Sequence, residues 1–305
     1  MPTFIYHAMT LPSDIDGVPV CYFCYDAVDE DGQLLQRDCA CRGTDAGFVH
    51  LACLMKYAET KSKQARDDMT EFVQPWETCP NCHQDYQNKL AVDIASKFVS
   101  FVRRQYPRDT HKQVESLYLK LCALDSMFGM LTPVQMIELG VTANVILSLI
   151  DRMKGDVSSL PIRYSQMKAE AYNTHGRIAL DEGTEESARR AVVHFGNELQ
   201  VNEAIGFIDG IAHAKLNIAY AKSKYEGNND EEVLKASEEL YKVRAAELGD
   251  EHEHTIKSGK NYATALRNAN RGDEARELLT KLLATSKQIL GSHHNTTKEI
   301  ELKLE

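Results

Sequence analysis

The stretch "CYFCYDAVDEDGQLLQRDCACRGTDAGFVHLAC" (residues 21–53) contains five cysteines and one histidine, and "CPNC" follows at residues 79–82. Seven of the eight cysteines of the chain therefore lie within its first 82 residues. The start of the chain lacks the basic and apolar segments of a secretory signal, so we expect a cytoplasmic or nuclear location. In these reducing compartments, clustered cysteines indicate metal ligands rather than disulfides.

The candidate ligands of this region form four pairs with short spacings. Eight thiolate and imidazole ligands suffice for two closed tetrahedral zinc sites, in which no position stays open for a catalytic water. The sequence therefore predicts two structural zinc ions and no hydrolytic centre. It also lacks a nucleophile elbow and a phosphate-binding glycine loop, so we expect no catalytic residues. The four pairs are Cys21 and Cys24, Cys39 and Cys41, His50 and Cys53, and Cys79 and Cys82.

The order of these ligands resembles that of the RING-CH (RING-variant) domain of ubiquitin ligases. Three features carry the resemblance: "CAC" followed by "RGT", the third pair within "FVHLACL", and the last pair as "CPNC". The resemblance implies cross-braced chelation, in which the first and third pairs bind one ion and the second and fourth pairs bind the other. The implied first site is Cys21, Cys24, His50 and Cys53, and the implied second site is Cys39, Cys41, Cys79 and Cys82.

The resemblance also implies a function. A RING-type domain docks a ubiquitin-conjugating enzyme and positions its ubiquitin thioester, so it acts as a scaffold without a covalent intermediate of its own. By resemblance, Phe23, Tyr57 and Pro80 would form the apolar docking surface. The alternative is that the two aromatic rings only cover the metal sites, because small domains bury whatever aromatic surface they have.

Two other functions remain open at this point. The only tryptophan, Trp76, lies three residues before Cys79, near the position where PHD fingers carry theirs, so a PHD-like reader of Lys-rich histone tails is one alternative. A non-enzymatic protein-binding adaptor is the other. Residues 1–92 hold seven basic and fourteen acidic residues, within a chain of net charge −10. Because phosphate backbones repel such a domain, we expect no nucleic-acid partner.

The sequence changes character at about residue 88. Leu90, Ile94, Phe98, Phe101 and Val102 recur at helical spacing, and later segments follow the same pattern without strand-like alternation. "LTP" predicts a helix that begins with Thr132 as N-cap and Pro133 at its first position. The predicted fold is a small zinc-stabilised α+β RING-like domain at residues 1–87, followed by an all-α solenoid of helix pairs at residues 88–305.

A repeat is visible at the end of the chain. "LGDEHEHT" (residues 248–255) recurs as "LGSHHNTT" (residues 290–297), and the segments between correspond. This pattern resembles tetratricopeptide repeats of the kinesin light chain type, and it is clearest over residues 204–305. Ala263, Gly272 and Ala275 would let paired helices approach closely. Stacked helix pairs typically bind proteins, so the resemblance implies client recruitment by this region.

The remaining candidates have structural explanations. His252, His254, His293 and His294 fall at the repeated linkers, so we expect them to form helix-start turns rather than a metal site. Cys122 lies in an apolar helical stripe, so we expect a buried thiol. The longest apolar run, "GVTANVILSLI", is too short for a bilayer, and we expect no membrane span.

Overall fold

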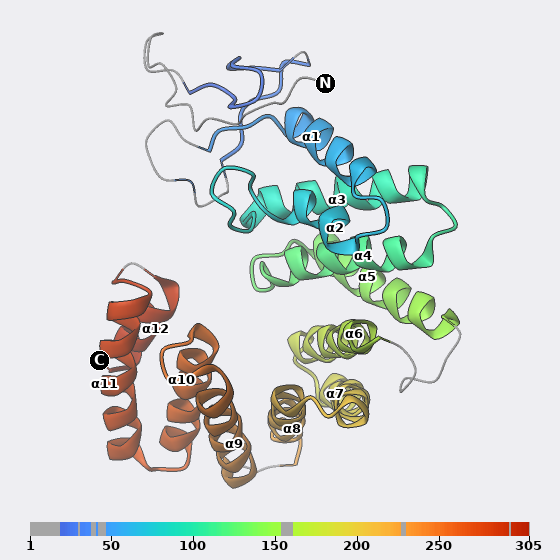
Figure 1. Ribbon diagram of the computed structural model, residues 1–305. Helices are drawn as coiled ribbons and strands as arrows, with labels where there is room; N and C mark the ends of the chain where they lie inside the picture. Colours follow the sequence, from blue (N-terminus) through green and yellow to red (C-terminus); the bar gives the residue numbers. More distant parts are fainter. Residues whose placement is uncertain are drawn as a thin grey trace. The chain divides into compact units, whose positions relative to one another are not determined.

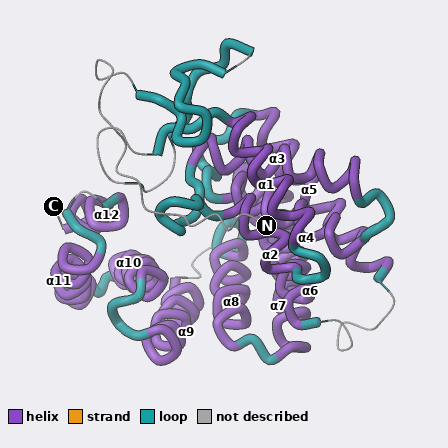
Figure 2. The backbone as a smooth tube through the Cα atoms, turned by 45° about the horizontal axis from the view of Figure 1, so that its top comes forward, coloured by secondary structure: helices purple, strands orange, loops and turns teal. Residues whose placement is uncertain are grey.

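The computed structural model of the chain describes residues 19–29, 31–37, 41, 47–153, 161–226, 230–292 and 294–304. Within these residues the chain forms twelve α-helices and three isolated antiparallel β-bridges (Figure 1). Figure 2 shows that the ligand-rich segment before α1 is drawn as loop, whereas helices dominate the rest. The predicted fold class, a small ligand-rich module followed by an all-helical region, is confirmed.

Two compact units divide the chain, Met1–Leu131 and Thr132–Glu305. The first unit contains four helices, two of which begin at an aspartate N-cap. Asp68 accepts a hydrogen bond from the backbone N–H of Glu71 (3.0 Å), and Asp109 accepts one from that of Lys112 (3.0 Å), which satisfies donors that a helix start leaves unpaired. The helices are α1 (Leu51–Gln64), α2 (Met69–Glu77), α3 (Asn88–Gln105) and α4 (Thr110–Asp125).

An aromatic core joins these four helices. Trp76 of α2 stacks on Phe98 of α3 with ring centroids 4.9 Å apart, and Phe72 and Phe101 lie beside them. All four rings are at most 1% exposed. The apolar stripe predicted for residues 90–102 forms this buried face of α3, and its five residues are all buried, as expected. Burial of rings of this size contributes about 1.5–3 kcal/mol each.

Because of this core, α3 and α4 pack with α1 and α2 in the first unit. The domain boundary expected after residue 87 stays a prediction for the zinc module itself, since the compact unit continues to Leu131. The expectation of a buried Cys122 was wrong, because this residue of α4 is exposed. The buried face of α4 is formed by Val114, Leu117, Leu121 and Leu124, and Cys122 follows Leu121 by one residue and points away from that face.

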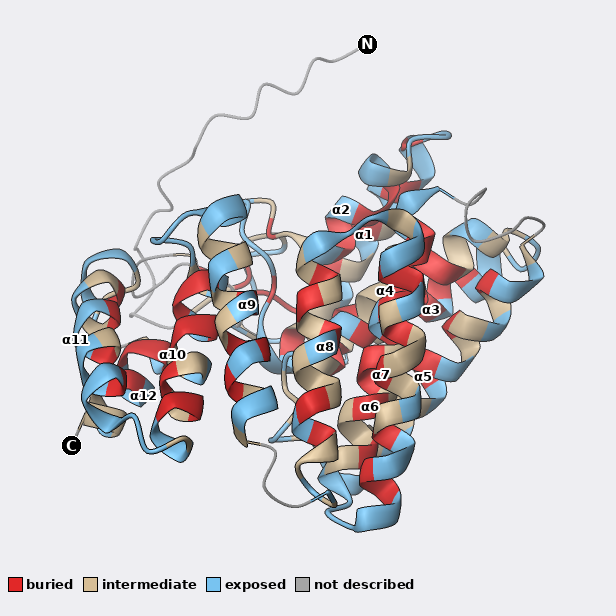
Figure 3. Ribbon diagram, turned by 90° about the horizontal axis from the view of Figure 1, so that it is seen from below, coloured by how far each residue is buried: buried red, intermediate tan, exposed pale blue. Residues whose placement is uncertain are grey.

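The second unit is all-helical within the described residues. Each helix from α5 to α12 contacts the next, and the buried residues lie where neighbouring helices meet (Figure 3). The start of α5 is as predicted, with Thr132 as N-cap in a capping box and proline at the start of the helix. The helices are α5 (Pro133–Arg152), α6 (Ile162–Asp181), α7 (Glu185–Ile205), α8 (Ile208–Lys222), α9 (Asp230–Leu248), α10 (Glu253–Asn268), α11 (Gly272–Ile289) and α12 (Asn295–Leu304).

The repeated linkers have the same backbone geometry. Gly249 and Gly291 both have φ of +89°, a left-handed conformation that favours glycine after a helix. Of the small residues expected to allow close helix contact, Ala263 and Ala275 are fully buried, but Gly272 has open space around it. Gly259 allows the close contact instead, since a Cβ there would lie 2.9 Å from Leu282. Gly272 begins α11, where no helix crosses it.

Helix α5 is long and apolar enough to cross a membrane by length and composition, and 28% of its most apolar window is buried. The whole helix, with 20 residues, is longer than the apolar run "GVTANVILSLI" that the sequence analysis considered. A single helix of this kind is weak evidence, because helices in the cores of soluble proteins meet the same criterion. The absence of a membrane span therefore stays a prediction.

Candidate metal centre

Four side chains from two distant segments meet at the start of α1. The thiols of Cys21, Cys24 and Cys53 and the imidazole of His50 offer ligand atoms that all lie within 4.8 Å of one another. His50 is the N-cap of α1, and its Nδ1 lies 3.3 Å from Cys24 Sγ and 3.9 Å from Cys53 Sγ. Zinc–sulfur bonds of about 2.3 Å place tetrahedral ligands about 3.8 Å apart, so this cluster fits one zinc ion.

Backbone amides surround the first cluster. The N–H groups of Phe23 and His50 donate to Cys21 Sγ at 3.4 and 3.5 Å. Burial acts to raise the pKa of Cys21, but backbone donation from His50 and others outweighs it and holds this pKa below its usual value. Burial, then the charge of Cys21, raise the pKa of Cys53 to about 12. A dication between the sulfur atoms would stabilise both thiolates, which is the chemistry that a structural zinc ion supplies.

The second cluster lies at the end of α2. Cys41, Cys79 and Cys82 also have their sulfur atoms within 4.8 Å of one another, and Cys41 Sγ lies 3.7 Å from Cys79 Sγ. Cys79 and Cys82 lie in one tight turn, in which the N–H of His83 donates to the carbonyl of Cys79 (2.9 Å). Cys39, the fourth ligand that we expect for this site, lies outside the described residues.

The two clusters interleave along the chain. The first combines the first and third ligand pairs, and the second combines Cys41 with the fourth pair, which is the arrangement that the resemblance implies. Neither cluster can form before the segment between residues 21 and 82 has folded back on itself. The module therefore has two Cys/His clusters able to bind metal ions, consistent with two structural zinc ions.

Two of the three expected docking residues, Phe23 and Tyr57, lie close to ligands of the first cluster in the chain. The rings of Phe23 and Tyr57 are 5.4 Å apart between centroids, and both are half-buried. Pro80 is half-buried in the turn between Cys79 and Cys82. Two aromatic rings that touch and stay partly open to solvent are compatible with a docking surface. Their role in binding a partner stays a prediction.

The position of Trp76 weakens the histone-reader alternative. Its ring is 1% exposed, and its Nε1 donates to Ser62 Oγ at 2.8 Å. The Ser62 hydroxyl in turn donates to the carbonyl of Phe72 at 2.7 Å. Trp76 therefore holds α1, α2 and α3 together and has no open face for a ligand.

A comparison with protein families identifies the module. The family model of the RING-variant domain matches residues 21–82, the span from the first ligand to the last. The chain therefore contains a RING-variant domain at its amino-terminal end, and the resemblance inferred from the ligand spacing is confirmed. Domains of this kind are typical of ubiquitin ligases.

Solved structures of two other proteins are similar to most of the chain. Crystal structures of BtubC (BKLC) from P. vanneervenii and of nearly identical TPR-like repeats of the kinesin light chain type from Podosopora anserina have 14% and 16% sequence identity. They cover 70% and 78% of this chain and 80% and 97% of their own, with TM-scores of 0.49 and 0.40. A comparison with curated proteins finds no match.

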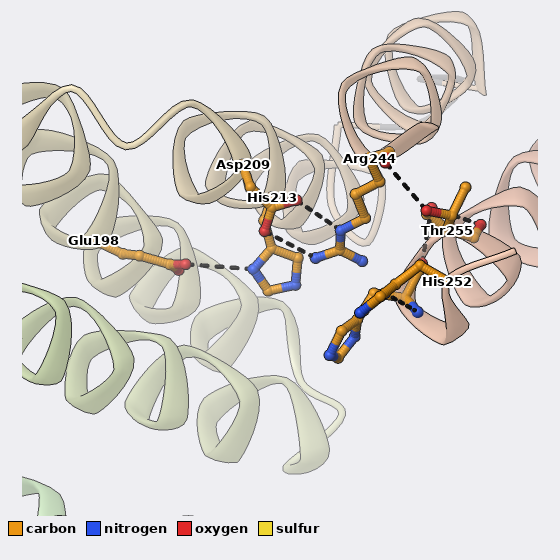
Figure 4. Close-up of polar contacts among 8 residues, drawn as sticks. Glu198, Asp209, His213, Arg244, His252 and Thr255 are labelled. Carbon is orange, nitrogen blue, oxygen red and sulfur yellow. Dashed lines mark hydrogen bonds and ion pairs between the residues drawn. The ribbon is translucent and has the colours of Figure 1, made fainter. Parts of the chain in front are cut away.

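The helical unit contains partly buried polar contacts between successive helices that the sequence did not reveal (Figure 4). Glu198 of α7 is 4% exposed, and its carboxylate lies 3.4 Å from His213 Nδ1 of α8. One turn earlier on α8, Asp209 pairs with Arg244 of α9 at 2.7 Å, and Thr255 of α10 donates to the Arg244 carbonyl at 3.1 Å. These contacts join four consecutive helices. A lone acidic residue at an apolar position of α7 is the one sequence signal that could have indicated them.

The linker histidines are helix caps, as expected. His252 Nδ1 accepts a hydrogen bond from the backbone N–H of His254 at the start of α10 (3.2 Å), and His294 Nδ1 accepts one from that of Thr296 at the start of α12 (3.3 Å). Each imidazole satisfies a donor of the first helical turn. His293 lies outside the described residues.

A second histidine pair gives a pH prediction. The rings of His175 (α6) and His194 (α7) stack 5.2 Å apart, and His175 Nε2 and His194 Nδ1 are buried without a hydrogen-bond partner in the described structure. Burial lowers the pKa of both below 6.5, and the charge of Arg190 lowers that of His194 further. The unfolded chain therefore binds protons at these two histidines more readily than the folded chain does. The free energy of unfolding that the pair contributes is thus fully present above pH 6.5 and decreases as the pH falls below that value.

We expect the second unit to melt at a lower temperature at about pH 5.5 than at about pH 7.5, as followed by circular dichroism. The variant His194→Phe keeps an aromatic ring and removes one titrating group, so its melting temperature should change less between the two pH values. An equal change in the variant and the wild type would show that the pair does not cause the effect.

Proposed function

We propose that this protein is a RING-variant ubiquitin ligase that docks a ubiquitin-conjugating enzyme through its zinc module and recruits client proteins through its helical repeats. The observation that carries the proposal is the contact of Phe23 with Tyr57 beside the first metal cluster, within a domain typical of ubiquitin ligases. The first cluster offers four protein ligands, and Cys39 would complete the second, so the metals would hold these rings in place rather than activate water. The chemistry would occur on the conjugating enzyme.

The helical architecture of the second unit supports the proposed role of the repeats in recruiting clients. Stacked helix pairs present extended surfaces to other proteins, and each pair is stabilised by its neighbours. The polar contacts of Glu198 with His213, of Asp209 with Arg244 and of Arg244 with Thr255 support this role, because they link four consecutive helices in pairs. We place the protein in the cytosol or nucleus, since thiolate ligands need reducing surroundings.

The test is a ubiquitination assay with purified protein, activating enzyme, a panel of conjugating enzymes, ubiquitin and ATP. We expect ubiquitin chains with at least one conjugating enzyme. The variant Phe23→Ala should lose about thirtyfold in rate, because truncation of a central interface aromatic costs about 2 kcal/mol of binding. Its zinc content should stay at two ions per chain.

The matched control is Tyr220→Ala, which truncates an exposed aromatic side chain of α8. It should form chains at the rate of the wild type. An absence of chains with every conjugating enzyme would contradict the ligase proposal and favour the adaptor. Micromolar binding to histone tail peptides would favour the PHD-like reader.

A further inference from the structure

Helix α1 is basic and, within the described residues, two of its lysines have no ion pair. The chain has a net charge of −10, yet α1 holds three lysines and a single acidic residue, Glu59. Glu59 is already paired, since its carboxylate lies 2.8 Å from Arg104 of α3 and 3.6 Å from Lys63. Lys56 and Lys61 are exposed, and within the described residues neither has an ion pair. In the part of the chain that the structure describes, α1 therefore presents an exposed basic surface.

These two lysines flank the candidate docking surface. Lys56 precedes Tyr57 directly, and Lys61 follows it by one helical turn, with Nζ 6.0 Å from the centroid of the Tyr57 ring. Tyr57 in turn touches Phe23. A protein that covers the two rings would therefore meet the Lys61 ammonium group at the edge of the contact, with exposed Lys56 on the next side of the helix.

The position of the lysines is fixed by the packing of α1. Leu54 and Ala58 are fully buried on its inner side, and Ser62 joins the helix to α2 through its bonds with Phe72 and Trp76. The backbone positions of both lysines are thus fixed relative to Tyr57, while their exposed side chains stay free to turn. Charges at an interface rim raise the association rate with partners of opposite charge and reject partners of like charge.

The loop that supplies Phe23 has the opposite charge. Its described residues include Asp26, Asp29 and Asp31, all in the same segment that follows the first ligand pair. Phe23 belongs to this acidic loop and Tyr57 belongs to the basic helix, and their rings are in contact. A partner that covers both rings would therefore meet a loop and a helix of opposite charge.

We propose that Lys56 and Lys61 determine which ubiquitin-conjugating enzyme this protein accepts, by pairing with acidic residues on the rim of the enzyme that faces α1. This inference rests on the proposed ligase function and adds the chemistry of the partner to it. The partner's docking surface would be apolar at its centre and acidic where it meets α1.

The experiment is charge reversal by the double variant Lys56→Glu and Lys61→Glu, with the conjugating enzyme that is fastest with the wild type. We expect the rate of chain formation to fall by about tenfold or more at low salt, because steering by opposite charges contributes factors of this size. The difference should narrow at about 0.5 M salt, where screening weakens exposed charges. Circular dichroism and a zinc content of two ions verify the fold of the variant.

The matched control is Lys97→Glu with Arg103→Glu, which reverses two exposed cations of α3 and changes the net charge equally. Its rate should equal that of the wild type. An equal loss in both double variants, or no loss in the first, would overturn the inference while leaving the ligase function in place. Wild-type protein that forms no chains with any conjugating enzyme would instead overturn the proposed function, and this inference with it.

Discussion

Removal of zinc by a chelator is expected to unfold residues 21–82, including α1 and α2. Each structural zinc ion contributes about 10–16 kcal/mol in small zinc domains, several times what one buried aromatic ring supplies. Helix α1 begins at the ligands His50 and Cys53, and α2 ends just before Cys79, so both helices lose an anchor when the metal leaves. Trp76 is the only tryptophan, and its emission should shift to longer wavelength as its buried ring meets water.

The same loss should follow from a single ligand substitution. Cys79→Ala removes a fully buried ligand of the second cluster, and we expect zinc content below two ions and a red-shifted Trp76 emission. Cys122→Ala is the matched control, because Cys122 is exposed on α4 and belongs to neither cluster. Metal-free protein with unchanged Trp76 emission would contradict the prediction and show that the aromatic core alone holds α1 and α2.

Trp76→Ala is expected to destabilise the first unit by about 3–5 kcal/mol. Truncation of a large buried aromatic leaves a cavity that the surrounding structure fills only in part. The variant also removes the donor to Ser62 Oγ, which adds to the cost because the hydroxyl loses one of its two buried bonds. Urea unfolding followed by circular dichroism measures the difference.

Two further variants separate the contributions at this position. Trp76→Phe keeps a six-membered aromatic ring but loses the N–H donor and part of the buried ring surface, so we expect a cost of about 1–3 kcal/mol. Tyr220→Ala removes an exposed aromatic and should cost less than about 1 kcal/mol. A cost for Trp76→Ala as small as that of Tyr220→Ala would show that the stack on Phe98 does not stabilise the unit.

The candidate metal ligands stand out in the sequence because their spacing is a local property. Two ligands separated by one or two residues can chelate one ion whatever the rest of the chain does, so the pairs are visible without a structure. The helical stripe of residues 90–102 and the cap at Thr132 were predictable for the same reason, since both depend on neighbours within one or two turns.

The sequence was less informative about the burial and contacts of single residues, because these depend on which helices pack against each other. Cys122 follows a buried leucine in an apolar stretch, and only the packing of α4 turns it outward. Gly272 and Gly259 look alike in the sequence, but only Gly259 lies against Leu282 of another helix. Trp76 suggested a PHD finger by its distance from Cys79, whereas its contacts with Phe98 and Ser62 make it part of a core.

The sequence by itself thus determined the ligand pairs, the helical character of the chain beyond residue 88 and the equivalence of the linkers at Gly249 and Gly291. These features depend on chemistry between near neighbours in the chain. The tertiary structure alone decided the extension of the first unit to Leu131, the contact of Phe23 with Tyr57 and the exposure of Lys56 and Lys61 beside it. These depend on residues far apart in the chain, whose meeting is set by how much apolar surface each arrangement removes from water.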